Sequence, residues 1–202
     1  ALPTELPSLL AHENASENIA SINLQNKYKL TIFFVRNKSG SHRKLILRGY
    51  MGSGKSVIGK ALSVVIGWPH VDLDAYIEAQ EGISIGTMFE TKGEVYFRTL
   101  EAKYLKDLMK IDESVVLSVG GGTPCYGMNL KLIMENGLSI YLQASVATLF
   151  ERLRSETSER PLVAEIGVEK LPEFIAKHLF ERRFYYDQAH HIVMTDDKTV
   201  PE

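Results

Sequence analysis

Cysteine is nearly absent from this sequence, since Cys125 is the only one in 202 residues. A single thiol excludes an internal disulfide and fits a reducing compartment. Long apolar runs are also missing: none approaches the roughly 20 residues that a membrane-spanning helix needs. The amino terminus has no basic segment followed by a signal-peptide core. We therefore expect a cytoplasmic protein that does not bind a membrane.

An excess of charge of one sign is missing as well. Lys and Arg together number 23 and Asp and Glu 25, for a net charge of −2, and no block of basic residues is present. This balance excludes a basic arm for nucleic acid. The length suits one α/β domain with a real core, and we expect it to be a monomer.

The chain divides near residue 43. Residues 1–43 are rich in Asn and Ser and indicate a poorly ordered extension of unknown role, and residues 44–202 form the predicted domain. Strand-like runs there alternate with segments of helical spacing, which predicts a parallel sheet covered on both faces. The expected strands are Lys44–Leu47, Pro69–Leu73, Val115–Val119, Gly137–Leu142 and Ile192–Thr195. The expected helices start near Ala75 and cover 94–109, 145–154 and 171–188.

A glycine-rich motif follows the first expected strand. Residues Gly49 to Ser56 match G-x-x-x-x-G-K-[ST] between a strand and a helix, which is typical of a P-loop. Glycines let the backbone wrap a polyphosphate, Lys55 can reach the β- and γ-phosphates, and the Ser56 hydroxyl can bind Mg²⁺. Because the loop contacts phosphates and not the base, it does not distinguish ATP from GTP. The predicted nucleotide contacts are Gly49, Met51, Gly52, Ser53, Gly54, Lys55, Ser56 and Val57.

Two aspartates close the second expected strand. Strand alternation would send Asp72 and Asp74 to one side and Leu73 to the other, although Asp74 could instead cap the next helix. Beside a phosphate loop, one carboxylate would lie near Mg²⁺ and the other would orient the attacking hydroxyl. We predict Asp72 in the first role and Asp74 in the second.

These motifs together resemble one family in identity, order and spacing. The phosphate loop, Asp72-Leu73-Asp74, Phe97-Arg98, the glycines 120–122, Arg160-Pro161 and the Arg182 helix are similar to those of shikimate kinases. The resemblance spans about residues 45–194. It implies a three-layer P-loop kinase fold with a central parallel five-stranded sheet, flanking helices and a mobile lid at about residues 155–170.

The resemblance also implies an activity and roles for the residues. The family transfers phosphate from ATP, with Mg²⁺, to shikimate, giving shikimate 3-phosphate on the route to chorismate and the aromatic amino acids. Asp74, Lys55 and Arg160 would be catalytic, with Arg160 closing onto the phosphates. Arg98 and Arg182 would bind the substrate carboxylate, with Arg183 as the alternative to Arg182. The substrate would also meet Gly120, Gly121 and Gly122, through a backbone N–H that we assign to Gly121.

Two rival functions stay open from sequence. The first is a related small P-loop kinase that acts on gluconate or a nucleoside monophosphate. The second is a nucleotide-binding module without turnover, which would have no use for Asp74, Arg98 and Arg160 together. An isolated Cys125 and the pair His190 and His191 are interpreted as structural.

Overall fold

The computed structural model describes residues 43–154 and 166–200. Nearly all of the predicted amino-terminal extension, and most of the predicted lid with Arg160, lie outside the described residues.

One parallel sheet organises the described residues. Its strand order is β2-β3-β1-β4-β5, and every neighbouring pair is parallel. The strands are β1 (Lys44–Arg48), β2 (His70–Asp72), β3 (Val115–Ser118), β4 (Leu138–Gln143) and β5 (His191–Met194). β1 lies at the centre and all five of its residues are buried, as expected of a parallel strand covered on both faces. The α/β class and the five-stranded parallel sheet are confirmed.

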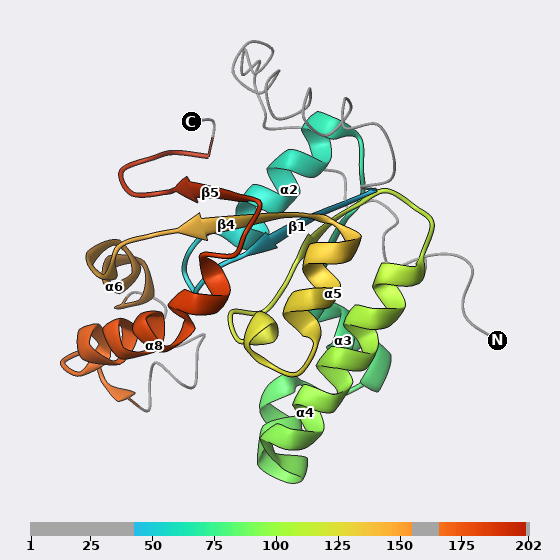
Figure 1. Cartoon of the computed structure of the whole chain (residues 1–202). Coiled ribbons are helices and arrows are strands. Elements are labelled where there is room, and N and C mark those ends of the chain that lie inside the picture. The colour runs from blue at the N-terminus through green and yellow to red at the C-terminus, as the bar shows by residue number, and fades with distance from the viewer. Residues whose placement is uncertain (1–42, 155–165, 201–202) are drawn as a thin grey trace, which may run out of the picture.

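Helices cover both faces of this sheet (Figure 1). They are α2 (Lys55–Ile66), α3 (Leu73–Glu81), α4 (Ile85–Lys110), α5 (Asn129–Asn136), α6 (Val146–Arg154) and α8 (Leu171–Tyr186), with a short 3₁₀ turn, η2 (Thr123–Cys125). On one face, Ile58, Leu62 and Trp68 pack near Leu45 and Leu47 of β1. On the other, α4 and α5 pack around Ile46, while α6 and α8 pack near Tyr141 of β4. This makes three layers.

Two predicted boundaries differ from the structure for identifiable reasons. The second strand ends at Asp72 and not at Leu73, because the Asp72 side chain accepts a hydrogen bond from the Asp74 N–H and caps α3. The helix predicted from Glu94 begins at Ile85, after the Ser84 cap, and bends at Gly93, whose φ is 79° and ψ 170°. Sequence periodicity found only the part of α4 after this bend.

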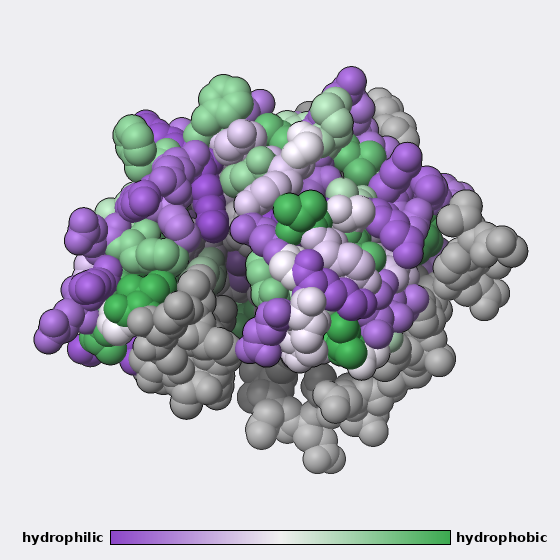
Figure 2. All heavy atoms as spheres, turned by 90° about the horizontal axis from the view of Figure 1, so that it is seen from below, coloured by the Kyte–Doolittle hydropathy of each residue, from purple (hydrophilic) through white to green (hydrophobic). Residues whose placement is uncertain are grey.

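Within the described residues, no helix is both long and apolar enough to cross a bilayer. On the face seen from below, hydrophilic and hydrophobic side chains are interspersed (Figure 2). The most exposed large apolar side chains are scattered over several helices, as with Val95 on α4 and Phe180 on α8, each 82% exposed.

Candidate active site

Glycines shape the loop between β1 and α2. Gly52 and Gly54 have φ values of 77° and 93°, a region that other residues rarely adopt. Gly49 leaves no room for a side chain, because an added methyl group would lie 2.6 Å from the Leu142 carbonyl oxygen. The loop thus runs tightly into the first turn of α2, where helix N–H groups and the helix dipole favour an anion such as phosphate.

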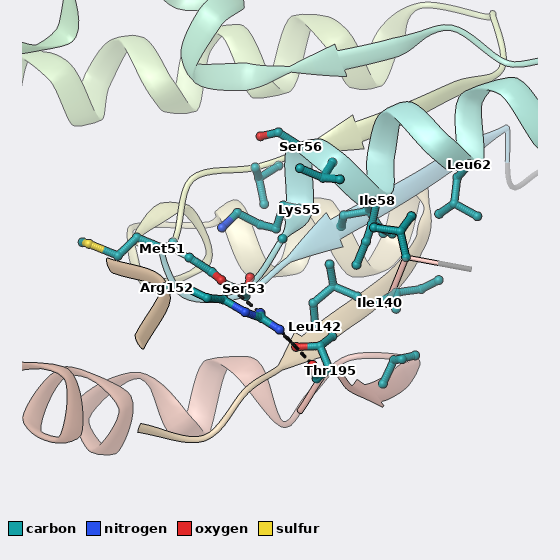
Figure 3. Close-up of a pocket in the computed structure, with 18 of the residues that line it drawn as sticks. Met51, Ser53, Lys55, Ser56, Ile58, Leu62, Ile140, Leu142, Arg152 and Thr195 are labelled. Carbon is teal, nitrogen blue, oxygen red and sulfur yellow. Dashed lines mark hydrogen bonds between the residues drawn. The ribbon is translucent and has the colours of Figure 1, made fainter. Parts of the chain in front are cut away.

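Lys55 and Ser56 open α2 with their side chains at this loop. The Lys55 ammonium donates to the carbonyl oxygens of Gly49 and Tyr50 at 3.0 and 2.9 Å, so the side chain folds back over the loop (Figure 3). The Ser56 hydroxyl donates to Asp72 Oδ2 at 2.8 Å. A hydroxyl and a carboxylate side by side suit Mg²⁺, which proteins usually bind through one or two oxygens together with substrate phosphates. Among residues 43–154 and 166–200, no group of three or more His, Cys, Asp or Glu could hold a metal.

Asp72 and Asp74 approach one another, but not by strand alternation. Asp72 is the last residue of β2, whereas Asp74 lies in the first turn of α3. The sequence-based geometry was therefore wrong, and so was the idea that Asp74 caps the helix, because Asp72 does so. Their proximity follows from the cap, in which the Asp74 N–H donates to Asp72 Oδ1 at 3.1 Å.

Asp74 is the most perturbed acid of the site. Its Oδ1 is buried and has no hydrogen-bond partner. Burial, with repulsion from Asp72 and Glu101, raises its pKa from 3.8 to about 6, against the opposing pull of Lys55 and Arg98. This raised pKa makes the Asp74 carboxylate better suited to accept a proton than a typical Asp.

The triple glycine after β3 is the point where the candidate residues meet. A methyl group on Gly120 would lie 3.1 Å from Asp74 Oδ1, one on Gly121 would lie 3.5 Å from Arg182 Nη1, and one on Gly122 would lie 2.8 Å from Arg98 Nη2. The Gly121 methyl would also lie 3.2 Å from the Gly49 carbonyl oxygen of the phosphate loop. None of the three glycines has a positive φ, so close approach is what requires glycine here.

Arg98 is fixed by neighbours that the sequence analysis missed. Its Nη1 donates to Glu101 at 2.9 Å and its Nε to Glu94 at 3.2 Å. The guanidinium also lies over the ring of Tyr126, 4.2 Å from the centroid, and the Tyr126 hydroxyl donates to Glu94 at 2.6 Å. Glu101 is only 1% exposed and also accepts from Thr123 at 2.6 Å. Its spacing of three from Arg98 on a helix was the available signal.

Arg182 and Arg183 point to different surroundings. Arg182 lies beside Gly121 and over the ring of Tyr50, 5.5 Å from the centroid, and its Nη1 and the Tyr186 hydroxyl both lie close to Gly121. Arg183 pairs with Asp187 at 3.1 Å, and its side chain is 77% exposed. Arg182 is therefore the one of the two that lies at the glycine turn.

A cavity of about 690 Å³ joins several of these groups (Figure 3). Asp72, Asp74, Gly120 and Gly121 line it together with the phosphate loop, and so do all the predicted loop contacts except Gly49. Arg98 and Arg182 do not line it and reach the site through the glycine turn. Arg152, which also lines the cavity, donates to the Gly52 and Thr195 carbonyl oxygens at 3.1 and 2.9 Å.

A family model and similar curated proteins point to the same family. A family model described as shikimate kinase matches residues 51–202. The shikimate kinase of Flavobacterium johnsoniae is 46% identical over 160 residues, which are 79% of this chain and 93% of that protein. The protein of the same name from Flavobacterium psychrophilum is 44% identical over 158 residues, covering 78% and 92% of the two chains.

Solved structures agree. The crystal structure of shikimate kinase from Bacteroides thetaiotaomicron, at 36% identity, has a TM-score of 0.72 and covers 76% of this chain and 86% of that one. The structure of shikimate kinase from Acinetobacter baumannii in complex with shikimate, at 30% identity, has a TM-score of 0.71 and covers 78% and 86%. With a matching family model and relatives of this identity and coverage, the chain belongs to the shikimate kinase family.

Proposed function

We propose that this protein transfers the γ-phosphate of ATP to the 3-hydroxyl of shikimate, giving shikimate 3-phosphate and ADP. The observation that carries the proposal is the glycine turn 120–122, around which Asp74, Arg98 and Arg182 gather. A methyl group on Gly121 of this turn would also touch the Gly49 carbonyl oxygen of the phosphate loop. Two arginines can bind a substrate carboxylate, and a carboxyl group of raised pKa can accept the proton of a substrate hydroxyl. A small hydroxylated acid therefore fits this turn better than a nucleotide does.

The phosphate half of the site, the loop from Gly49 to Ser56, would hold ATP through its backbone and the start of α2. Lys55 would turn from the Gly49 and Tyr50 carbonyl oxygens to the β- and γ-phosphates. Ser56 and Asp72, already in hydrogen-bond contact, are the residues that would hold Mg²⁺, which when bound neutralises phosphate charge. Arg160 stays a predicted contact of the transferred phosphate.

The acid half of the site, made of Asp74, Arg98 and Arg182, would bind and activate the acceptor. Arg98 and Arg182 would pair with the shikimate carboxylate, while Asp74 accepts the hydrogen bond of the reacting hydroxyl. The hydroxyl oxygen forms a bond to Pγ as the bond from Pγ to the β–γ bridging oxygen breaks, and the hydroxyl proton passes to Asp74. Because phosphoryl transfer has a loose transition state, an acid with a pKa of about 6 is basic enough for this late proton transfer.

The deciding experiment is ADP release by the purified full chain with shikimate, gluconate, AMP or water as acceptor. We expect release with shikimate alone and a product phosphorylated at the 3-hydroxyl by NMR. The Lys55→Ala variant is the matched blank, since it shows any contaminating kinase. Release with gluconate or AMP at an equal or greater rate would refute the proposal, and release with water alone would indicate an ATPase.

Four finer points remain for other measurements. The monomeric state can be tested by light scattering, and the cytoplasmic location by fractionation of cells that express the full chain. The roles of residues 1–43 and of the lid at about 155–170 can be tested by deletion of the first and by protease protection of the second in the presence of ATP and shikimate.

A further inference from the structure

Tyr186 is a buried phenol at the end of α8 that no step of the proposed reaction uses. It is 1% exposed, and its hydroxyl donates to the Gly121 carbonyl oxygen at 2.6 Å, a contact between residues 65 positions apart. We infer that Tyr186 is a positioning residue that sets both Arg182 and the glycine turn for the substrate carboxylate. This inference rests on the proposed function.

The ring and the carbonyl oxygen of Tyr186 also have fixed partners. Its ring packs against Tyr141 with centroids 4.9 Å apart. Its carbonyl oxygen accepts from Nη2 of Arg48 at 3.2 Å, and Arg48, at the end of β1, is fully buried. The last turn of α8 is thus fastened to the strand that leads into the phosphate loop.

The hydroxyl has two partners with complementary needs. Burial raises the pKa of Tyr186 well above its ordinary value, so the phenol stays protonated and its single O–H donates to Gly121. Its lone pairs are then available to accept from the Arg182 guanidinium, which lies beside the same glycine: a methyl group on Gly121 would lie 3.4 Å from the Tyr186 hydroxyl oxygen and 3.5 Å from Arg182 Nη1. The guanidinium also lies over the ring of Tyr50, so neighbouring groups on two tyrosines would reduce the rotational freedom that Arg182 loses on binding an anion.

The bond to Gly121 also aims a donor. The Gly121 carbonyl and the Gly122 N–H belong to one trans peptide, so fixing the oxygen toward Tyr186 turns the Gly122 N–H in the opposite direction. Gly122 is the glycine that packs against Arg98. One hydroxyl therefore orients Arg182 directly and the turn beside Arg98 through the backbone. The N–H that this arrangement fixes is that of Gly122, and the Gly121 N–H stays the predicted contact of the substrate.

The test removes the hydroxyl and keeps the ring. Tyr186→Phe should raise the KM for shikimate about 10- to 100-fold, the range for a lost hydrogen bond to a charged group. The kcat and the KM for ATP should stay within about twofold, because the reacting atoms and the loop are untouched. The matched control is Tyr141→Phe, which removes a hydroxyl from the ring that packs against Tyr186 and should leave all three constants unchanged.

A second ligand separates positioning from a general structural defect. The methyl ester of shikimate lacks the anion that Arg182 would bind, so wild type should favour the acid over the ester, and Tyr186→Phe should lose most of that preference. Replacement of Tyr186 by p-aminophenylalanine, which can still donate to Gly121, should restore part of it. All assays are run below the melting temperature of the least stable variant.

The outcomes divide cleanly. Equal losses for acid and ester, a fall in kcat at constant KM, or no change in Tyr186→Phe would overturn the inference while wild-type turnover of shikimate upholds the proposed function. Absence of shikimate turnover in wild type would overturn the proposed function and the inference with it.

Discussion

The phosphate-binding half of the site is one short stretch of backbone, whereas the acid-binding half is assembled from side chains of separate elements. The loop from Gly49 to Ser56 is contiguous and depends on glycine conformations. The acid half takes Asp74 from α3, Arg98 from α4 and Arg182 from α8, and joins them at the glycine turn. A change far from the loop should spare phosphate binding, whereas the acid half depends on contacts made across the whole domain.

Charge is handled differently in the two halves as well. The loop offers N–H dipoles and one ammonium, and its cavity is open enough for Val57 to remain 59% exposed. The acid half buries a carboxylate, Glu101, against the guanidinium of Arg98. Buried charges are costly unless they are paired, so this half should respond to changes of charge more than to changes of shape.

The largest effect should come from breaking the phosphate half. Lys55→Ala should lower kcat by about 1,000-fold or more, because its ammonium would stabilise charge that develops on the transferred phosphate. The KM for shikimate should change little, measured by ADP release over a range of shikimate. Lys60→Ala, an exposed lysine of the same helix, is the control and should behave as wild type. An equal loss in both variants would contradict the division of the site.

The reverse experiment breaks the acid half and spares the loop. Arg98→Lys keeps a positive charge beside Glu101 but loses the planar fork, so the KM for shikimate should rise about 10- to 100-fold. ATP affinity, measured by calorimetry without shikimate, should stay within about twofold of wild type. Arg183→Ala is the control, because that side chain is 77% exposed and pairs with Asp187. Unchanged shikimate affinity in Arg98→Lys would refute the role given to Arg98.

The same contrast explains what sequence could predict. The loop could be read from its motif, because a run of glycines before Lys55 and Ser56 dictates its own backbone. The parallel sheet followed from apolar runs separated by helix-length segments, and it was confirmed. The turns before Gly93 were missed because the non-helical backbone of Gly93 interrupts the helix between them and the part that was predicted.

The supporting residues of the acid half were harder to find. Glu101 could have been paired with Arg98 from helical spacing. Nothing local indicates that Tyr186 reaches Gly121, because that contact depends on how α8 packs against the turn after β3. The raised pKa of Asp74 was missed for the same reason, since it comes from burial and from Glu101, which belongs to another helix.

A stability measurement tests the cost of the buried acid. Because the pKa of Asp74 is raised in the folded state, its penalty is absent below the ordinary value of 3.8 and complete above about 6. Asp74→Asn should therefore increase the free energy of unfolding by about 1 to 3 kcal/mol at neutral pH, and by little near pH 4. Urea unfolding in EDTA checks this, with the exposed Glu113→Gln as control. A gain that does not depend on pH would exclude Asp74 titration as its source.

The smallest effect concerns the carboxylate that links Arg98 to Asp74. Glu101→Gln keeps the size and the hydrogen bond to Thr123 but removes a negative charge that raises the pKa of Asp74. With that repulsion gone, and Arg98 less neutralised, the acid limb of kcat/KM should move to lower pH by about half a unit. Glu94→Gln touches Arg98 from its half-exposed side and should move the limb less. A limb that stays in place, or moves to higher pH, would mean that Asp74 does not govern the acid limb, and the acid half would then bind shikimate without supplying its base.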